Sequence, residues 1–212
     1  KYIIQDNPKG IGHALKLCGK YIKGQRVMLA LGDNIFHGQG FVDILQKAAE
    51  FSKKRAVLFS YNVQVPEDFG IIAKSEKGDW LQIEEKPKNP VSNKAITGLY
   101  FYPPEVLEKL DTLYPSNRGE IEITDLNNLF VKEGKVEVFQ LGRGFAWFDA
   151  GTPSAMVKAS MYMQTLSELQ NTKIACLEEI SYKNGWVSAD ELSQIISIMP
   201  DSLYKDYLSN LD

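Results

Sequence analysis

The spacing of hydrophobic residues predicts alternating helices and strands over the first part of the chain. A short β-like stretch at 2–4 comes first, and residues 12–22 and 41–51 then carry apolar side chains at helical spacing. Residues 27–31 and 55–63 are almost continuously apolar and rich in types that favour strands. This alternation predicts parallel strands covered by helices.

The middle of the chain has a different pattern, which predicts antiparallel pairing. Residues 70–73 and 80–84 surround a Gly-Asp turn and are typical of a hairpin. A strand follows at 95–102 and ends where two prolines remove backbone donors. A helix with an apolar face from Ile123 to Phe130 then precedes a strand at 136–141. The central sheet is therefore expected to be mixed.

The pattern from Thr152 onward is helical. Thr152 is placed to cap a helix that continues with Pro153, and Met156 begins an apolar stripe completed by Ala159, Met163 and Leu166. Ser188 and Glu191 have the spacing of a capping box before a second helix. We expect an α/β domain over 1–151 and a C-terminal helical segment over 152–212.

Composition narrows the classes of partner. The chain has 212 residues, a net charge of −3 and two cysteines with no metal-binding spacing, so both thiols are expected to be reduced. This charge argues against a general nucleic-acid surface. Because no apolar run is long enough to span a membrane and no signal peptide is recognisable, we expect a cytoplasmic protein with small-molecule partners.

Two aspartates follow apolar stretches and precede or follow glycines. Asp33 lies in the turn after the 27–31 strand, and Asp149 lies between an aromatic run and Gly151. Each aspartate is placed either to cap a following helix or to meet a metal or phosphate at a strand end. Together they could share one divalent cation, because Mg²⁺ takes one or two protein carboxylates and leaves positions for substrate phosphates.

Two further groups are candidates for binding, and the histidines are not. Glu85 and Lys86 stand at a strand end stopped by Pro87, where they form either a solvated edge or a pair that accepts sugar hydroxyls and holds a phosphate. Gln5 has an amide suited to a base edge and precedes a Pro-Lys-Gly turn. His13 and His37 have no catalytic partner at motif spacing and are interpreted as structural or peripheral.

Seven sequence blocks occur in an order that resembles glucose-1-phosphate thymidylyltransferases over essentially the whole chain. They are Gln5-x-x-Pro8-x-Gly10, Leu31-Gly-Asp-Asn-Ile-Phe36, Phe69-Gly70, Glu84-Glu-Lys-Pro87, Thr97-Gly-Leu-Tyr-Phe-Tyr102, Arg118-Gly-Glu-Ile-Glu-Ile-Thr-Asp125 and Gly142-Arg-Gly-Phe-Ala-Trp-Phe-Asp-Ala-Gly-Thr152. The resemblance implies a Rossmann-like nucleotidyltransferase fold over 1–151. It also implies transfer of a nucleotide from dTTP to glucose 1-phosphate, giving dTDP-glucose and pyrophosphate.

The resemblance also implies roles for individual residues and a homo-tetrameric assembly. Asp33 and Asp149 would bind Mg²⁺, with Asn34 beside them, and Lys86 and Asp33 would take part in catalysis. The thymine and the glucose 1-phosphate would be held by two groups of residues: Gln5, Pro8 and Gly10 for the base, and Gly70, Glu85, Lys86 and Ile96 for the sugar phosphate.

Two departures from the family pattern create alternatives. The Gly-rich N-terminal signature that loops around the triphosphate is not seen, so the first strands of the fold are expected to be missing and the chain as given to be a poorly active fragment. A non-catalytic assembly or regulatory module is the alternative from a different class. The segment Gly10-Ile-Gly-His-Ala14 is similar to bacterial glucose-1-phosphate uridylyltransferases, which makes UTP the alternative nucleotide.

Overall fold

The computed structural model describes residues 1–211, and its contacts separate the chain into two compact units, Lys1–Gly151 and Thr152–Asp212. The helices of the first unit are α1 (Ile11–Leu17), α2 (Gly19–Ile22), α3 (Phe41–Phe51), the 3₁₀ turn η1 (Pro66–Asp68), α4 (Val106–Leu110) and α5 (Ile123–Lys132). Its strands are β1 (Val27–Ala30), β2 (Asn34–Gly38), β3 (Ala56–Asn62), β4 (Gly70–Ile71), β5 (Glu84–Glu85), β6 (Lys94–Tyr102), β7 (Val136–Leu141) and β8 (Phe145–Asp149).

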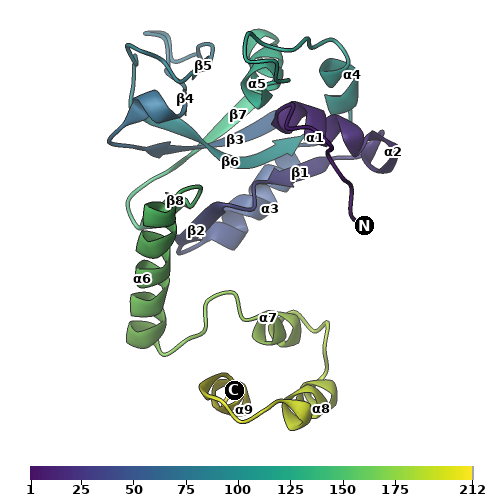
Figure 1. Ribbon diagram of the computed structural model, residues 1–212, viewed down its shortest axis with the longest axis vertical. Coiled ribbons are helices and arrows are strands. Elements are labelled where there is room, and N and C mark those ends of the chain that lie inside the picture. Colours follow the sequence, from purple (N-terminus) through teal and green to yellow (C-terminus); the bar gives the residue numbers. More distant parts are fainter. Residues whose placement is uncertain (212) are drawn as a thin grey trace. The chain divides into compact units, whose positions relative to one another are not determined.

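The central sheet is mixed, as the sequence predicts. Its strands run in the order β5-β4-β6-β3-β7, with β1 also paired to β6 (Figure 1). Among the strand pairs of residues 1–211, β3 with β7 is the one parallel pair, and β1, β3 and β4 all run antiparallel to β6. β1 and β3 therefore point the same way. They do not pair with each other, because β6 lies between them. The sequence therefore predicted correctly that β1 and β3 run parallel, but the expectation that such parallel strands pair with each other was wrong for these two.

Helices cover both faces of this sheet. On one face, α1, α4 and α5 contribute Leu15, Val106 and Leu126 to a core that includes Leu58 of β3 and Tyr102 of β6. On the other face, Phe41, Ile44 and Leu45 of α3 pack against Val57 and Phe59 of β3. Alternate side chains at the start of β3 thus enter two different cores, which explains why residues 56–59 are apolar without a break.

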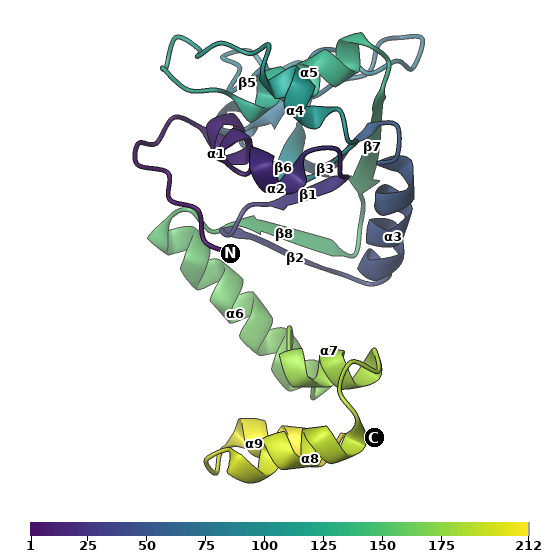
Figure 2. The ribbon, with the colours of Figure 1, turned by 90° about the vertical axis from the view of Figure 1, so that its right-hand side faces the viewer.

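A second, two-stranded sheet lies beside this second core and forms one side of the candidate site. Figure 2 shows β2 and β8 side by side. They pair antiparallel, with Asn34 opposite Asp149 and Gly38 opposite Phe145. Phe36 and Phe145 of this ribbon pack against the same core as α3. Since Asp33 leads into a strand, the alternative in which it caps a helix is wrong.

Two other predicted strands differ from the structure. Residues 2–4 form no strand, and Tyr2 and Ile4 are 103% and 79% exposed, so their apolar character is not used to build a sheet. The predicted hairpin is reduced to β4 paired with β5 and a single bridge between Lys74 and Trp80.

The second unit consists of α6 (Pro153–Gln170), α7 (Leu177–Lys183), α8 (Ala189–Ile198) and α9 (Leu203–Ser209). Thr152 caps α6 by accepting a hydrogen bond from Ala155 N at 3.2 Å, and Ser188 and Glu191 form the predicted capping box of α8. The predicted apolar stripe of α6 is not a core face, since Ala159 alone among its residues is buried and Met156 is 52% exposed. No helix in residues 1–211 is both long enough and apolar enough to cross a membrane.

Candidate functional site

A cavity of about 180 Å³ in the first unit gathers most of the predicted ligand-binding residues. β2, β6, β8, α5 and the β4–β5 segment all contribute to its wall. Six predicted residues line it: Asn34, Gly70, Glu85, Lys86, Ile96 and Asp149. These residues come from distant parts of the sequence. The fold therefore brings together residues that the sequence blocks place far apart along the chain.

Asp33 and Asp149 approach one another at the end of the β2–β8 ribbon. The main-chain oxygen of Asp33 accepts a hydrogen bond from Ala150 N at 2.7 Å, and Asp149 stands opposite Asn34 in the ladder. A Cβ atom placed on Gly151 would lie 3.2 Å from Asp149 Oδ1 and 3.6 Å from Asp33 Oδ2. Both carboxylates therefore face the same small region, and neither caps α6, whose cap is the Thr152 side chain.

Asn34 holds the Asp33 carboxylate in place. Its Oδ1 accepts hydrogen bonds from Gly98 N at 2.8 Å and from Trp147 Nε1 at 2.7 Å. Because both partners can only donate, they fix which end of the amide is oxygen, and Nδ2 is left to donate to Asp33 Oδ1 at 2.9 Å. A Cβ on Gly98 would lie 2.6 Å from Asn34 Oδ1, so only glycine leaves room for this contact.

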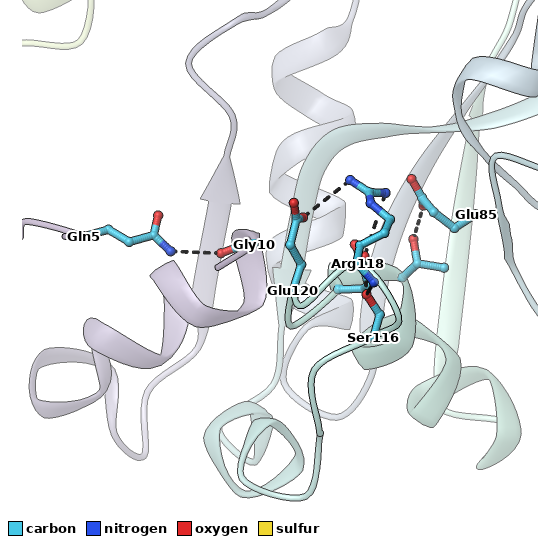
Figure 3. A network of polar contacts seen from close by, with 8 residues as sticks. Gln5, Gly10, Glu85, Ser116, Arg118 and Glu120 are labelled. Atoms are coloured by element: carbon cyan, nitrogen blue, oxygen red, sulfur yellow. Dashed lines mark hydrogen bonds and ion pairs between the residues drawn. The ribbon is translucent and has the colours of Figure 1, made fainter. Parts of the chain in front are cut away.

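Glu85 is oriented by a residue of α5. Thr124 Oγ1 donates to Glu85 Oε2 at 2.5 Å, and Figure 3 shows this contact beside the Arg118 loop. Gly70 lies opposite in the β4–β5 pair, where an added Cβ would come within 3.1 Å of the same oxygen. The Thr124 hydroxyl thus fixes the Glu85 carboxylate at the cavity wall, and the absence of a side chain on Gly70 leaves room for it there.

Lys86 has an unusual backbone conformation. Its φ angle is +47°, in the left-handed region that residues with a Cβ rarely adopt, and its N–H donates to Phe69 O at 3.0 Å. The next residue, Pro87, is buried. Local backbone strain of this kind persists where the surroundings fix it, and it commonly marks a functional position.

The cavity carries an excess of negative charge. Its wall contains the carboxylates of Asp68, Glu85 and Asp149, and among its described lining residues Lys86 is the one lysine or arginine. Burial, followed by the charges of Glu85, Asp149 and Asp33, raises the pKa of Tyr100 above its ordinary value. A phosphate ligand entering this field would need an additional cation, so the donor set fits a divalent metal ion.

The metal-binding capacity of this site rests on two carboxylates. Among the described residues there is no group of three or more His, Cys, Asp or Glu side chains placed to hold a metal. Asp33 and Asp149 alone match the one or two carboxylates with which proteins commonly hold Mg²⁺ when substrate phosphates complete the coordination.

The three residues expected to hold the base lie outside this cavity wall. Gln5 Nε2 donates to Gly10 O at 3.1 Å and contacts His13 Nδ1 at 2.8 Å, and Pro8 is exposed. Gly10 has a φ of +88°, and a Cβ there would lie 2.7 Å from Ile121 O. Ile11, the next residue, does line the cavity, which makes the Gln5–Gly10 segment adjacent to it.

The two histidines occupy different settings. His13 contacts Gln5, one of the residues expected to hold the base, which is compatible with the predicted structural role. His37 lies within β2, opposite Ala146 of β8.

Three lining residues with specific roles were not among the predicted site residues. They are Tyr100, Thr124 and Trp147, which line the cavity together with the predicted group. Each one falls inside a sequence block that carried the family resemblance. Membership of these blocks was therefore the sequence feature that could have marked them as site residues. Their spacing gave no hint that Thr124 would bond Glu85 or that Trp147 would bond Asn34.

Comparisons with known proteins agree with this fold and identify its family. Residues 1–165 match the family model described as nucleotidyl transferase. The chain is 42% identical over 210 residues to the glucose-1-phosphate thymidylyltransferase of Neisseria meningitidis serogroup A, covering 99% of this chain and 73% of that protein. It is 36% identical to the protein of the same name from Mycobacterium tuberculosis strain H37Rv, covering 99% and 72%.

Solved structures show the same architecture. A Bacillus anthracis protein assigned as a glucose-1-phosphate thymidylyltransferase, crystallised with sucrose, aligns with a TM-score of 0.66 and 35% identity, covering 76% of this chain and 64% of that one. A UDP-glucose pyrophosphorylase in complex with UDP-glucose aligns with a TM-score of 0.68 at 23% identity, which shows the fold alone.

The fold and the family model together define a nucleotidyl transferase. Within that class, the chain belongs to the family of glucose-1-phosphate thymidylyltransferases.

Proposed function

We propose that this protein transfers the thymidylyl group of dTTP to glucose 1-phosphate, giving dTDP-glucose and pyrophosphate. The observation that carries the proposal is the cavity that gathers Asn34, Glu85, Lys86 and Asp149 from separate elements. Relatives at 42% and 41% identity carry the name of this activity. We assign the activity to the α/β domain at 1–151, with 152–212 as the helical appendage.

The glucose 1-phosphate site is proposed to consist of Gly70, Glu85, Lys86 and Ile96. The Lys86 ammonium is a compact cation suited to the sugar phosphate. The left-handed backbone conformation of Lys86 fixes the position from which its side chain extends. The Glu85 carboxylate, oriented by Thr124, accepts hydrogen bonds from sugar hydroxyls. Gly70 leaves room for the Glu85 carboxylate beside it.

The nucleotide site is proposed to consist of Gln5, Pro8 and Gly10, which hold the thymine, with Asn34 near the phosphates. Asn34 acts mainly through Asp33, because three of its four hydrogen-bonding positions are already engaged by Gly98, Trp147 and Asp33.

Members of this family typically use a divalent metal, and we propose Mg²⁺ held by Asp33 and Asp149. When bound, Mg²⁺ neutralises phosphate oxygens and lowers the electrostatic barrier to attack on the α-phosphorus. The excess of carboxylates around the cavity supports this assignment.

The chain's own contribution to catalysis is positioning. Lys86 holds the attacking phosphate oxygen of glucose 1-phosphate, and Glu85 fixes the sugar so that this oxygen is in line with the α-phosphorus of dTTP. The pyrophosphate leaves on the opposite side as the new bond forms. No side chain needs to form a covalent bond with the substrate, so rate depends on orientation and charge.

A UTP-dependent transfer to the same sugar phosphate is the second candidate, favoured by His13 in the Gly10-Ile-Gly-His-Ala14 segment. Thymine and uracil present the same hydrogen-bonding edge and differ by one methyl group. One missing methyl group changes specificity by only about 10-fold to 200-fold, so both nucleotides need direct comparison.

We also propose a homo-tetramer located in the cytoplasm. Four large apolar side chains of the second unit, Leu169, Trp186, Ile198 and Leu203, are 72% to 84% exposed and would be covered by association. Light scattering coupled to gel filtration tests this assembly, and a monomeric mass would reject it. Nucleoside triphosphates and sugar phosphates are cytoplasmic metabolites, which supports the location.

The experiment is a pyrophosphate-release assay on the full-length protein with glucose 1-phosphate and either dTTP or UTP in the presence of Mg²⁺. We expect turnover with dTTP and a higher kcat/KM for dTTP than for UTP. Turnover with UTP alone would select the second candidate, and no turnover with either nucleotide would reject the enzyme assignment.

A further inference from the structure

The start of α1 contains a small hydrogen-bonded cluster that joins Gln5, Gly10 and His13. The amide nitrogen of Gln5, Nε2, lies 3.1 Å from Gly10 O and 2.8 Å from His13 Nδ1. Figure 3 shows the amide nitrogen directed at Gly10 and the amide oxygen on the other side. Gly10 precedes the first residue of α1, and His13 lies in its first turn.

The chemistry of the three partners fixes every proton in this cluster. Gly10 O is a carbonyl oxygen and can only accept, so the amide atom that faces it must be the nitrogen of Gln5. That nitrogen can only donate, so His13 Nδ1 must be unprotonated and the neutral ring must carry its proton on Nε2. Both N–H groups of Gln5 are then used, which leaves Oε1 as the group available to a ligand.

An amide fixed in this way can distinguish pyrimidine bases. Thymine and uracil carry an N3–H donor that Oε1 accepts. Cytosine carries an unprotonated N3 at the same position, and two acceptors facing each other leave both without a partner and repel. Rotating the Gln5 amide to offer its nitrogen would break its bonds to Gly10 and His13 together.

We propose that His13 is a positioning residue which holds the Gln5 carboxamide with its oxygen toward the base, so that the site selects thymine and uracil against cytosine. This inference rests on the proposed function, in which Gln5 contacts the base of the nucleotide. It assigns His13 a role that acts through Gln5. It also predicts that any side chain with a hydrogen-bond acceptor at the position of Nδ1 will hold the Gln5 amide in the same orientation.

The chain allows a matched pair of variants. His13→Phe keeps a ring of similar size but has no acceptor, whereas His13→Asn places its amide oxygen at the same number of bonds from the backbone as Nδ1. Loss of one hydrogen bond corresponds to about a tenfold change in an equilibrium. We expect His13→Phe to raise the KM for dTTP by about this factor, more than it lowers kcat, and to lower the dTTP-to-CTP ratio of kcat/KM similarly.

His13→Asn is expected to keep the wild-type dTTP-to-CTP ratio within about threefold, because one restored hydrogen bond recovers most of the loss. An unchanged ratio in His13→Phe, or equal loss in both variants, would overturn the inference while dTTP turnover by the wild type would leave the proposed function standing. If the wild type turned over neither dTTP nor UTP, the proposed function itself would fail.

A second measurement does not depend on the folding of any variant. Long-range proton–nitrogen NMR spectra of the wild-type protein report which ring nitrogen of His13 is protonated at neutral pH. We expect the proton on Nε2 and an unprotonated Nδ1. A proton on Nδ1 would overturn the inference, because Nδ1 could then accept nothing from Gln5.

Discussion

At the residue scale, the proposed function depends on the two carboxylates beside Gly151, which we assign as metal ligands. Replacing Asp33 or Asp149 by Asn keeps the shape of each side chain and removes a metal-ligand charge. We expect each variant to lower kcat by about 10²-fold or more, measured by pyrophosphate release with saturating substrates and Mg²⁺. Asp79→Asn, in the turn between Lys74 and Trp80, is the control and should match the wild type. A near wild-type kcat for either Asp33→Asn or Asp149→Asn would show that the metal is held elsewhere.

A second residue-scale prediction concerns Thr124, which holds the Glu85 carboxylate. Thr124→Val keeps the volume and removes the hydroxyl, so Glu85 loses its anchor on α5. A hydrogen bond to a charged group contributes about 1.5–3 kcal/mol, and we expect the KM for glucose 1-phosphate to rise about tenfold with little change in the KM for dTTP. Thr124→Ser retains the donor and should rescue the sugar-phosphate KM. If the nucleotide KM changed instead, Glu85 would belong to the other substrate.

At the element scale, Gly12 allows α1 to lie close to the loop before α5. A Cβ at Gly12 would lie 2.7 Å from Ile121 O and 2.8 Å from its Cγ2, whereas a Cβ at Gly19 in α2 would meet nothing closer than 3.7 Å. We expect Gly12→Ala to lower the free energy of unfolding by about 1–3 kcal/mol in urea, since overpacking forces the backbone to move. Gly19→Ala is the matched control and should stay within about 0.5 kcal/mol. Equal stability of both variants would mean that α1 can shift without cost.

In the second unit, Glu179 ties α7 to α9. Burial opposes its ionisation, but hydrogen bonds from Lys183 Nζ and Tyr207 Oη, each at 2.6 Å, outweigh burial and hold the pKa of Glu179 below its ordinary 4.5. A lowered folded-state pKa adds stability above the ordinary pKa, and this stability is lost as the pH falls through the lowered value.

Glu179→Gln should therefore unfold more easily than the wild type at pH 7, and the difference should shrink as the pH falls below 4.5. Urea unfolding followed by circular dichroism at several pH values measures this. Tyr207→Phe removes one donor and should give a smaller effect of the same sign. A difference that stayed constant with pH would rule out the ionised Glu179 as its cause.

Elements with strong local patterns were predictable. The helix Phe41–Phe51 and the strand Val136–Leu141 were predicted with their observed ends, and the capping box at Ser188 formed as expected. The strand β2 was not predicted, because all five of its residues are half-buried and its partner, β8, lies more than a hundred residues away. Local hydrophobic spacing carries no information about such a pairing.

At the scale of the whole molecule, the sequence blocks identified the family, but the contacts within the site depended on the fold. The bond from Trp147 to Asn34 joins residues 113 positions apart, and that from Thr124 to Glu85 joins residues 39 apart. Neither pair is visible from spacing, because the first depends on the pairing of β2 with β8 and the second on α5 meeting β5 at the cavity wall. The predicted carboxylates and Lys86 were recognisable because each follows or ends a strand.

In the proposed mechanism, the phosphate of glucose 1-phosphate attacks the α-phosphorus of dTTP. Glucose 1-phosphate labelled with ¹⁸O in its phosphate oxygens tests this directly, with both products analysed by mass spectrometry. In-line attack on the α-phosphorus predicts dTDP-glucose that retains all of the label and pyrophosphate that contains none. Label in the pyrophosphate, or no dTDP-glucose from the full-length protein with Mg²⁺, would contradict the account.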